Sequence, residues 1–400
     1  MLTESVESAL VELYAEVGGP ASGAALAAVG SLARRELGPR SDIDLVLLHS
    51  GKSSAKINTL AGDLWYPLWD ARIRVDHAVR TPAECADVAG RELSAGVGLL
   101  DLRVITGDAE LVKDARTALL DHWRGHTRKR LPELLASLDE RLATFGDAAY
   151  LLEPDLKEAR GGFRDVSMLR ALAASWLTDR PHVGIGGPYQ RLLDVRDALH
   201  LASGRTLDRL ISGETAAVAT RLGYHEADDL RREVSLAARR IGHAVDLTVR
   251  AARQALPPHR VLSFIKRERK PNYVPADHGL IISSGEVGLG RTTNASDPLV
   301  GLRAGALVAR RGLVLSPVTA DNLGQQGQAL PSPWPQVCRD ALLDMLATGP
   351  NVVPVWEALD LAGCISRWIP SWEPIRARPQ HNPVHRHTVD RHLVQTVAEA

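Results

Sequence analysis

Two aspartates separated by one residue, Asp42 and Asp44, stand at the start of the run DIDLVLLH, which predicts a buried strand. Side chains alternate between the two faces of a strand, so both carboxylates point to one side and Ile43 points to the other. Two carboxylates on one face repel each other. A divalent cation between them would relieve that repulsion, so Asp42 and Asp44 are candidate metal ligands.

The residues before this strand are suited to phosphate binding. Gly30 and Ser31 form a predicted turn into a short helix, and the amide groups at the start of a helix attract phosphate oxygens. Arg34 and Arg35 add positive charge within reach of a polyphosphate. A phosphate cradle beside paired aspartates fits nucleotidyl transfer from a nucleoside triphosphate, in which Mg²⁺ or Mn²⁺ ions clamp the attacking and leaving oxygens. A D-x-D pair alone also occurs on solvated strand edges, and its combination with the Gly-Ser turn is what favours catalysis.

A third carboxylate is expected from the next strand. Asp76 lies in the alternating segment ARIRVDHAVR, residues 71–80, which predicts a strand beside the D-x-D strand. Its side chain would look into the cleft, as a metal ligand or as the base that takes the proton of the acceptor. His77 would face the opposite way as a packed histidine. Asp108 is the competing carboxylate, although its setting, ITGD, predicts a turn or a helix cap.

Length and composition bound the wider organisation. A chain of 400 residues predicts two to four domains, and 45% hydrophobic with 24% charged residues is typical of globular proteins. Lysine plus arginine equals aspartate plus glutamate at 48 each, so no nucleic-acid partner is expected. Cys85, Cys338 and Cys364 match no metal or disulfide spacing, which favours a reducing cytoplasm. We expect neither a secretory signal nor a membrane span.

The spacing of apolar residues predicts an α/β unit followed by helices. The α/β unit is predicted to contain helices at residues 3–17 and 56–70, a short helix through Leu37, and strands at residues 24–30, 42–49 and 71–80. From residue 110 to about 256 the spacing is helical, interrupted by residues 153–165 and 179–188. Beyond it, residues 278–290 predict a hairpin, residues 297–312 a helix, and the last seventy residues a further helical segment.

The segment GSLARRELGPRSDIDLVLL resembles the nucleotidyltransferase domain of the bifunctional uridylyltransferase/uridylyl-removing enzymes of bacterial nitrogen regulation. The family motif runs G-G-x-G-R-x-E, a spacer, then S-D-I-D. It is matched here by Gly30, Arg34, Glu36, Ser41, Asp42 and Asp44. Ser31 and Ala33 stand where the family has glycine. Ser31 fits the G-S of the wider polymerase-β-like superfamily, whereas Ala33 restricts the approach of a phosphate to the backbone.

Further segments extend the resemblance over nearly the whole chain. Similar to family segments are DHAVRTPAE at residues 76–84, EPDLKEARGGFRDV at 153–166 and DPLVGLRAGALVARRGLVLSPVT at 297–319. In the second, a loop broken by Pro154 and two glycines carries Lys157 and Arg164. These cations either neutralise triphosphate charge or belong to a structural salt-bridge cluster. The Ala- and Arg-rich composition suggests an actinobacterial version.

The resemblance implies a fold class, a division into domains and an activity. The fold class is α+β, with a polymerase-β-like nucleotidyltransferase α/β domain, a helical bundle and the truncated start of a helical HD domain. The expected domains are residues 1–115 (nucleotidyltransferase), 116–256 (helical bundle), 257–330 (mixed connecting segment) and 331–400 (incomplete HD domain). The implied reaction is Mg²⁺-dependent transfer of UMP or AMP from the NTP to a tyrosine of the PII signal protein, releasing pyrophosphate.

The last residues bear on the second activity of that family. HTVDRH, residues 387–392, looks like the entry to the metal-dependent HD phosphohydrolase domain, with His392 as the expected first metal ligand. No His-Asp dipeptide and no glutamine-sensing ACT domain follow, so we expect a truncated or naturally shortened member that lacks uridylyl removal. The histidines of HNPVHRH, residues 381–387, have no cysteine or acidic partners at metal spacing, which disfavours a zinc site.

Two alternatives fit the same residues. One is a nucleotidyltransferase with another acceptor, such as a tRNA 3′ end or a small molecule, and the other is a catalytically silent regulatory module. Neutral net charge argues against tRNA, and the intact D-x-D argues against silence. The choice between UTP and ATP depends on the shape of the base pocket, which the phosphate- and metal-binding residues do not specify.

Overall fold

The computed structural model describes residues 2–51, 54–179, 184–255, 273–381 and 387–400. Its larger sheet has the strand order β3-β2-β1-β4. Strand β1 (Ala24–Ala28) is antiparallel to both β2 (Ile43–His49) and β4 (Arg103–Gly107). Strand β3 (Val75–Arg80) pairs in parallel with β2, and the register sets Asp44 opposite Asp76. The predicted neighbouring strand is therefore confirmed, although it begins at Val75 and not at residue 71.

The two faces of this sheet are covered by different helices because alternate strand residues enter different cores. Leu26, Leu45 and Leu47 pack against α1 (Leu2–Glu16) and α3 (Ser54–Asp70). Ala25, Val46 and Leu48 pack on the other face, against α4 (Pro82–Arg91), α5 (Leu93–Leu99) and the start of α6 (Ala109–Phe145). Asp44 has the parity of Val46, so its side chain belongs to the face covered by α4, α5 and α6.

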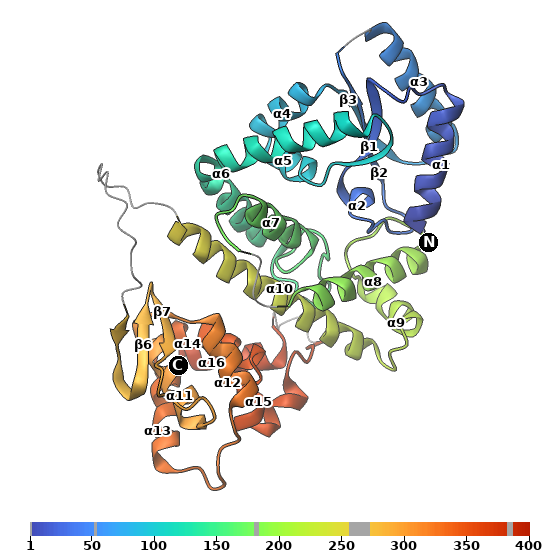
Figure 1. Ribbon diagram of the computed structural model, residues 1–400. Coiled ribbons are helices and arrows are strands. Elements are labelled where there is room, and N and C mark those ends of the chain that lie inside the picture. The colour runs from blue at the N-terminus through green and yellow to red at the C-terminus, as the bar shows by residue number, and fades with distance from the viewer. Residues whose placement is uncertain (1, 52–53, 180–183, 256–272, 382–386) are drawn as a thin grey trace, which may run out of the picture.

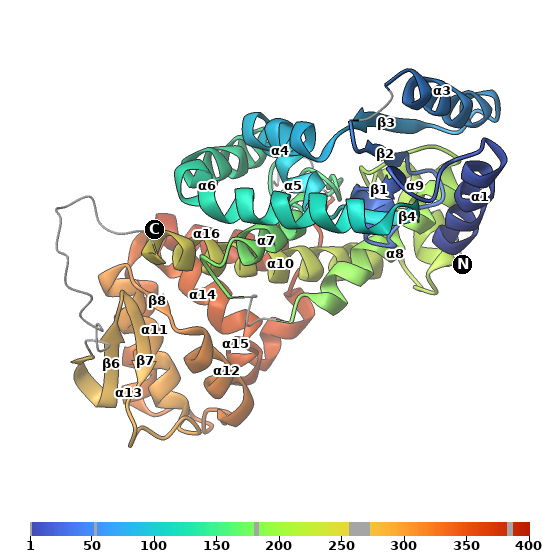
Figure 2. The same ribbon diagram turned by 45° about the horizontal axis from the view of Figure 1, so that its top comes forward.

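Helix α6 continues from the sheet into the following helices, as Figure 2 shows. Val112, Ala115 and Leu119 pack on the sheet, whereas Trp123 and Leu131 belong to a core shared with α7 (Phe163–Ala174). The Trp123 indole N–H donates to the Ala171 carbonyl at 2.8 Å. The expected domain boundary at residues 115/116 therefore falls inside one continuous helix.

A central group of helices shares one core. It consists of α7, α8 (Gly186–Ser203), α9 (Ser212–Arg221) and α10 (Ala227–Ala255). Leu192, Val195, Leu199, Val234 and Ile241 lie in that core together with Leu156 from the loop before α7. The loop that ends where α7 begins at Phe163 is thus anchored by its own buried Leu156.

The C-terminal unit has a small sheet against helices. The sheet order is β5 (Val274–Pro275), β6 (Leu280–Ser283), β7 (Glu286–Leu289) and β8 (Val314–Leu315). The helices are α11 (Pro298–Arg311), α12 (Pro317–Gln326), α13 (Gln336–Leu346), α14 (Val352–Leu361), α15 (Cys364–Trp368) and α16 (Val389–Glu399). The β6–β7 pair confirms the predicted hairpin, and α11 confirms the predicted helix. One core extends from Leu280 to Ala398, so the expected boundary at 330/331 separates no two cores.

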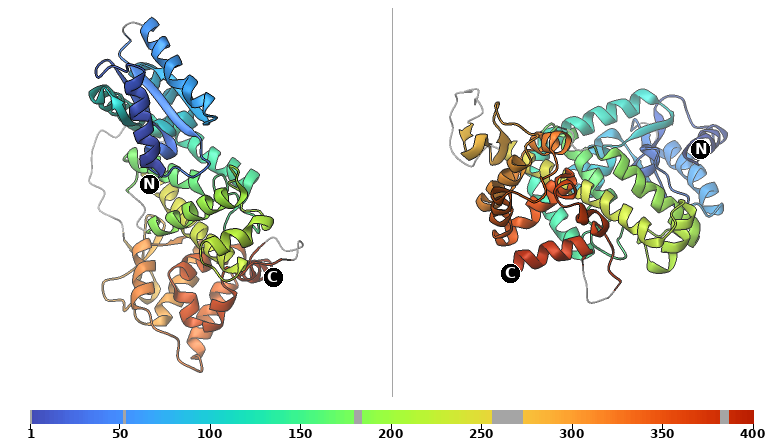
Figure 3. Two further views of the ribbon diagram at one scale, coloured as in Figure 1. Left: turned by 90° about the vertical axis from the view of Figure 1, so that its right-hand side faces the viewer. Right: turned by 90° about the horizontal axis from the view of Figure 1, so that it is seen from below.

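The three parts follow one another through the molecule. In Figure 1 the larger sheet and its helices (blue to cyan) lie at one end, α7 to α10 (green and yellow) in the middle, and the C-terminal unit (orange and red) at the other end. Figure 3 shows the same order from the side. The fold is mixed α+β, as predicted from the sequence. None of the helices in the described ranges combines the length and apolar character that crossing a membrane requires.

Candidate active site

The three predicted aspartates line one cavity of about 640 Å³. Asp44 and Asp76 project from neighbouring strands at the same register position, and Asp42 precedes β2. The face assignment made from the alternation of strand residues therefore places all three at one cavity. Asp42 Oδ1 lies 2.9 Å from Arg74 Nε in an exposed ion pair, so its charge is partly balanced by that cation.

Asp44 is the carboxylate whose ionisation is made unfavourable by this arrangement. Burial, together with the negative charges of Asp76 and Asp42, raises the pKa of Asp44 from 3.8 to about 6. The positive charges of Lys157 and Arg34 act in the opposite direction without cancelling these effects. A carboxylate that is costly to ionise beside two others is a common feature of catalytic and cation-binding sites.

Gly30 lets the backbone pass close to Asp44. It has a φ of +59°, and a Cβ at this position would overlap the Asp44 carboxylate oxygen Oδ2. Gly30 and Ser31 both line the cavity, as predicted. The helix they open, α2 (Gly30–Ala33), has only 4 residues, so the prediction of a helix through Leu37 is wrong. Because α2 is so short, we expect side-chain cations to contribute more to phosphate binding than its backbone amides do.

The two predicted arginines have different places. Arg34 lines the cavity, with its Nε 2.7 Å from Glu36 Oε2 and its Nη1 2.6 Å from Asp101 Oδ2. Arg35 is exposed, has a φ of +60°, and is not among the lining residues. The structure thus brings Arg34 to the site and leaves Arg35 outside it, because the chain turns sharply away at the end of α2.

Lys157 reaches the cavity from the loop before α7, and Arg164 reaches it from the first turn of that helix. Asp155 Oδ1 accepts the backbone N–H groups of Lys157 and Glu158, which fixes the turn. Lys157 Nζ lies 4.0 Å from Asp208 Oδ2, and Arg164 Nε lies 3.2 Å from Glu158 Oε1. Both cations are about half exposed, so they are paired yet able to meet an anion in the cavity.

Glu36 is a residue whose role the sequence did not reveal. Its carboxylate accepts hydrogen bonds from Arg34, from Arg170 of α7 at 2.9 Å and from the Tyr189 hydroxyl of α8 at 2.7 Å. Burial tends to raise its pKa, but Arg170, Tyr189 and Arg34 outweigh it and lower the pKa. The R-x-E spacing of the motif pointed to Glu36, but its partners come from distant helices that no local pattern connects.

The remaining predicted side chains lie as expected. Asp108 caps α6 by accepting from Leu111 N at 3.0 Å and also accepts from Gly23 N at 2.8 Å, outside the cavity. The His77 ring packs at 4.9 Å from Trp65 and 5.3 Å from Trp69, measured between centroids. Of these two candidates for a third carboxylate beside Asp42 and Asp44, Asp76 lines the cavity and Asp108 does not.

A divalent cation fits the donor chemistry of the cavity, which offers carboxylate oxygens that repel one another. In the described parts of the chain, however, no three His, Cys, Asp or Glu side chains are gathered closely enough to hold a metal ion. Asp42 would have to leave Arg74 to join Asp44 and Asp76. For the disfavoured zinc site, residues 382–386 lie outside the described residues, and His381 lies 2.9 Å from Asp228.

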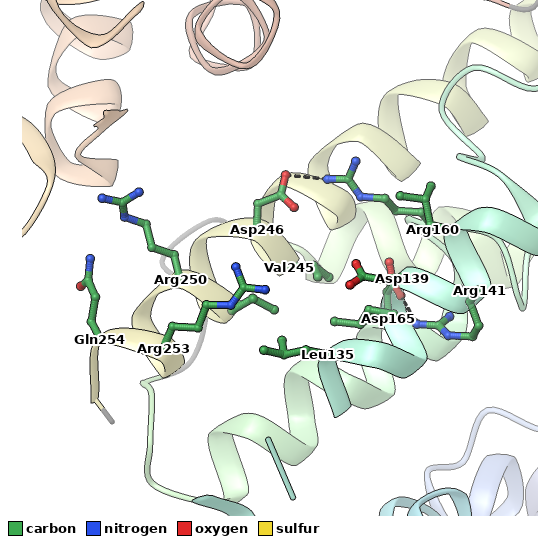
Figure 4. Close-up of a pocket in the computed structure, with 13 residues that line it drawn as sticks. Leu135, Asp139, Arg141, Arg160, Asp165, Val245, Asp246, Arg250, Arg253 and Gln254 are labelled. Atoms are coloured by element: carbon green, nitrogen blue, oxygen red, sulfur yellow. Dashed lines mark hydrogen bonds and ion pairs between the residues drawn. The ribbon is translucent and has the colours of Figure 1, made fainter. Parts of the chain in front are cut away.

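A second cavity, of about 650 Å³, lies between α6 and α10 (Figure 4). Two of its carboxylates are held by arginines: Asp165 by Arg141 and Asp246 by Arg160, each at 2.5 Å. Apolar side chains, including Leu135, complete its wall. Because Asp165 and Asp246 are each held by an arginine, whereas Asp44 and Asp76 meet in register in a cavity that Lys157 also lines, we take the first cavity as the candidate active site.

Two family models match parts of this chain. Residues 10–98 match the family described as nucleotidyltransferase domain, and this matched range contains all three aspartates. Residues 129–249 match the family GlnD PII-uridylyltransferase, and this matched range contains Lys157 and Arg164.

Bifunctional uridylyltransferase/uridylyl-removing enzymes resemble the whole chain. That of Streptomyces coelicolor is 45% identical over 100% of this chain and 49% of its own length. Those of Mycobacterium tuberculosis H37Rv and Corynebacterium glutamicum are 40% and 33% identical, over 98% and 99% of this chain and 50% and 56% of their own lengths. The chain thus spans about half the length of these relatives. Parts of the chain thus match the nucleotidyltransferase domain and the GlnD PII-uridylyltransferase family, and the whole chain is similar to about half of the bifunctional uridylyltransferase/uridylyl-removing enzymes of these actinobacteria.

Proposed function

We propose that this chain transfers a nucleoside monophosphate from an NTP to a tyrosine hydroxyl of a PII protein and releases pyrophosphate. The observation that carries the proposal is the meeting of Asp44 and Asp76, in register on one sheet face, with Lys157 from the loop before α7 in the same cavity. Carboxylates on one wall and cations on the other match the two needs of phosphoryl chemistry, cation binding and charge neutralisation.

Each side chain has a role in this proposal. Asp44, Asp76 and, once released from Arg74, Asp42 would hold Mg²⁺ or Mn²⁺, which supplies charge neutralisation to the triphosphate oxygens. Lys157 and Arg164 offset charge that develops on the phosphates. Asp76 is exposed at the edge of the sheet, so it can also accept the proton of an incoming tyrosine hydroxyl.

The names of the relatives favour UTP as the donor, and ATP is the competing donor. The proposal also includes a helical bundle and the start of an HD domain, although the expected boundaries at 115/116 and 330/331 do not coincide with breaks in the fold.

The test is to incubate the chain with PII, Mg²⁺ and labelled UTP or ATP in separate reactions. We expect label on PII, and a loss of about 10²-fold or more in Asp44→Asn, since that change removes a charge at the reacting phosphate. Asp121→Asn is the matched control, because the Asp121 side chain is 70% exposed on α6 and lies outside the cavity.

Other outcomes would contradict the proposal. Label on tRNA or a small molecule, but not on PII, would favour another acceptor. No transfer to any acceptor would favour a silent module. Equal activity of Asp44→Asn and Asp121→Asn would move the reaction away from this cavity.

A further inference from the structure

Resting on the proposed function, we propose that the open edge of β3, together with the exposed aromatic side chains of α3, is the docking surface for the acceptor protein. The occupant is an extended segment of that protein that carries the reacting tyrosine. We call this the β3-edge surface, and it comprises the backbone of β3 at Val75, His77 and Val79 and the side chains of Tyr66, Trp69 and His77.

Strand β3 is the end strand of the larger sheet, so only one of its sides is paired. Ile43 N donates to the Arg74 carbonyl at 2.9 Å, and Ile43 is in register with Val75. In a parallel ladder, alternate residues turn their backbone groups to the partner strand, so Asp76 bonds toward β2. The N–H and C=O groups of Val75, His77 and Val79 then point to the open side, where no partner is found among the described residues.

An aromatic pair stands beside this edge. The side chains of Tyr66 and Trp69 are 64% and 43% exposed, and their rings meet edge to face at 5.5 Å. His77 packs against Trp69, so it joins the strand to the aromatic pair. Aromatic side chains next to unpaired backbone groups give an added strand both side-chain contact and hydrogen bonds.

The edge is continuous with the candidate active site. Asp76, which faces the cavity, directly precedes His77, whose side chain packs on the α3 side of the strand. A segment added to β3 would lie about 4.8 Å away, with alternate side chains directed to the two faces. One set would approach Asp76, and the other would contact Tyr66 and Trp69.

This geometry identifies the chemistry of the occupant. An extended peptide can place a tyrosine hydroxyl at the cavity while its neighbouring side chains cover the aromatic pair. A small-molecule acceptor would need only the cavity and would leave the edge uncovered. The surface therefore fits a protein acceptor with an exposed, extended loop.

The test compares the double variant Tyr66→Ser/Trp69→Ser with the control Trp176→Ser, which removes a still more exposed tryptophan (75% exposed) that lies outside the cavity. We expect the double variant to raise KM for PII about tenfold or more, because contacting aromatic residues dominate protein interfaces. The NTP-dependent shift in Tm should equal that of the unmodified chain. Trp176→Ser should change neither quantity.

The outcomes separate this inference from the proposed function. If the unmodified chain labels PII and the double variant has an unchanged KM for PII, the docking surface is wrong and the proposed function stands. If the unmodified chain does not label PII, the proposed function is wrong, and PII is then not the occupant of the β3-edge surface.

A second measurement does not depend on catalysis. A photo-cross-linking residue placed at Tyr66 should capture PII, and the same residue placed at Trp176 should not. Cross-linked dimers of this chain, in place of the PII adduct, would assign the edge to self-association and overturn the proposal.

Discussion

At the scale of single residues, the ionised Asp44 carboxylate lowers the stability of the fold while providing a negative charge in the cavity. Burial and the charges of Asp76 and Asp42 raise its pKa to about 6, so its ionised form is less favourable in the folded chain than in the unfolded chain. The folded state therefore binds the proton more tightly, and stability falls as pH rises from about 4 to about 6. Near neutral pH the full cost is present.

We predict that Asp44→Asn, which lowers transfer, also stabilises the metal-free chain at pH 7. The expected gain is on the order of 1–3 kcal/mol, because each unit of pKa shift corresponds to about 1.4 kcal/mol and solvent screening reduces it. The gain should be much smaller at pH 4, where the carboxyl is protonated in the folded chain and about half protonated in the unfolded chain. Thermal unfolding in a chelating buffer at the two pH values measures it, with Asp121→Asn as control. A gain that is the same at pH 4 and pH 7 would contradict the electrostatic explanation.

At the scale of elements, local sequence predicted those parts of the site that depend on strand alternation and turn chemistry. Asp42, Asp44 and Asp76 were placed by strand alternation, and the loop at residues 153–165 by its proline and glycines. Strand β4, only 5 residues long, was not predicted, since RVITG offers little periodicity. The exclusion of Arg35 follows from a left-handed backbone turn that its residue type does not announce.

What local sequence could not supply is the contact between distant elements. Glu36 meets Arg170 and Tyr189, which are 134 and 153 residues away along the chain. These bonds tie the segment that follows α2 to α7 and α8. The same carboxylate also holds Arg34 at the cavity. Glu36 thus positions both its own segment and Arg34, although Glu36 is not among the residues that line the cavity.

We predict that Glu36→Gln lowers stability by about 2–4 kcal/mol, because hydrogen bonds to a buried charge are worth more than neutral ones and the partner arginines lose their counter-charge. Transfer should fall about tenfold, with a rise in KM for NTP as Arg34 loosens. Glu133→Gln is the control, since Glu133 is 53% exposed and pairs only within α6. Equal unfolding temperatures for the two variants would show that Glu36 does not position these elements.

At the scale of the whole molecule, the middle helices are joined to the C-terminal unit by a buried ionic cluster. The Arg239 side chain on α10 is 3% exposed and contacts three carboxylates across this junction. Glu357 and Asp360 of α14 lie at 2.6 Å, and Asp390 of α16 lies at 3.2 Å. Asp360 also pairs with Arg376 at 2.9 Å, so the cluster holds more than one cation. The domain boundaries expected from the sequence do not anticipate this connection, because its members are separated by over a hundred residues.

We predict that Arg239→Met destabilises the chain by about 3–5 kcal/mol, since removing one partner of a buried ionic group leaves the others uncompensated. The control is Arg232→Met, which breaks an ion pair across the same junction, to Glu373 at 2.8 Å, where both side chains are a third to a half exposed. Exposed pairs contribute at most about 1 kcal/mol. Hydrogen exchange should become faster in α14 and α16 of Arg239→Met. The NTP-dependent Tm shift should stay unchanged in both variants, because the candidate active site includes neither residue.

If both variants lose the same stability, the buried cluster does not hold the C-terminal unit to α10. If only Arg239→Met loosens α14 and α16, this one guanidinium connects the helices behind the cavity to the C-terminal unit.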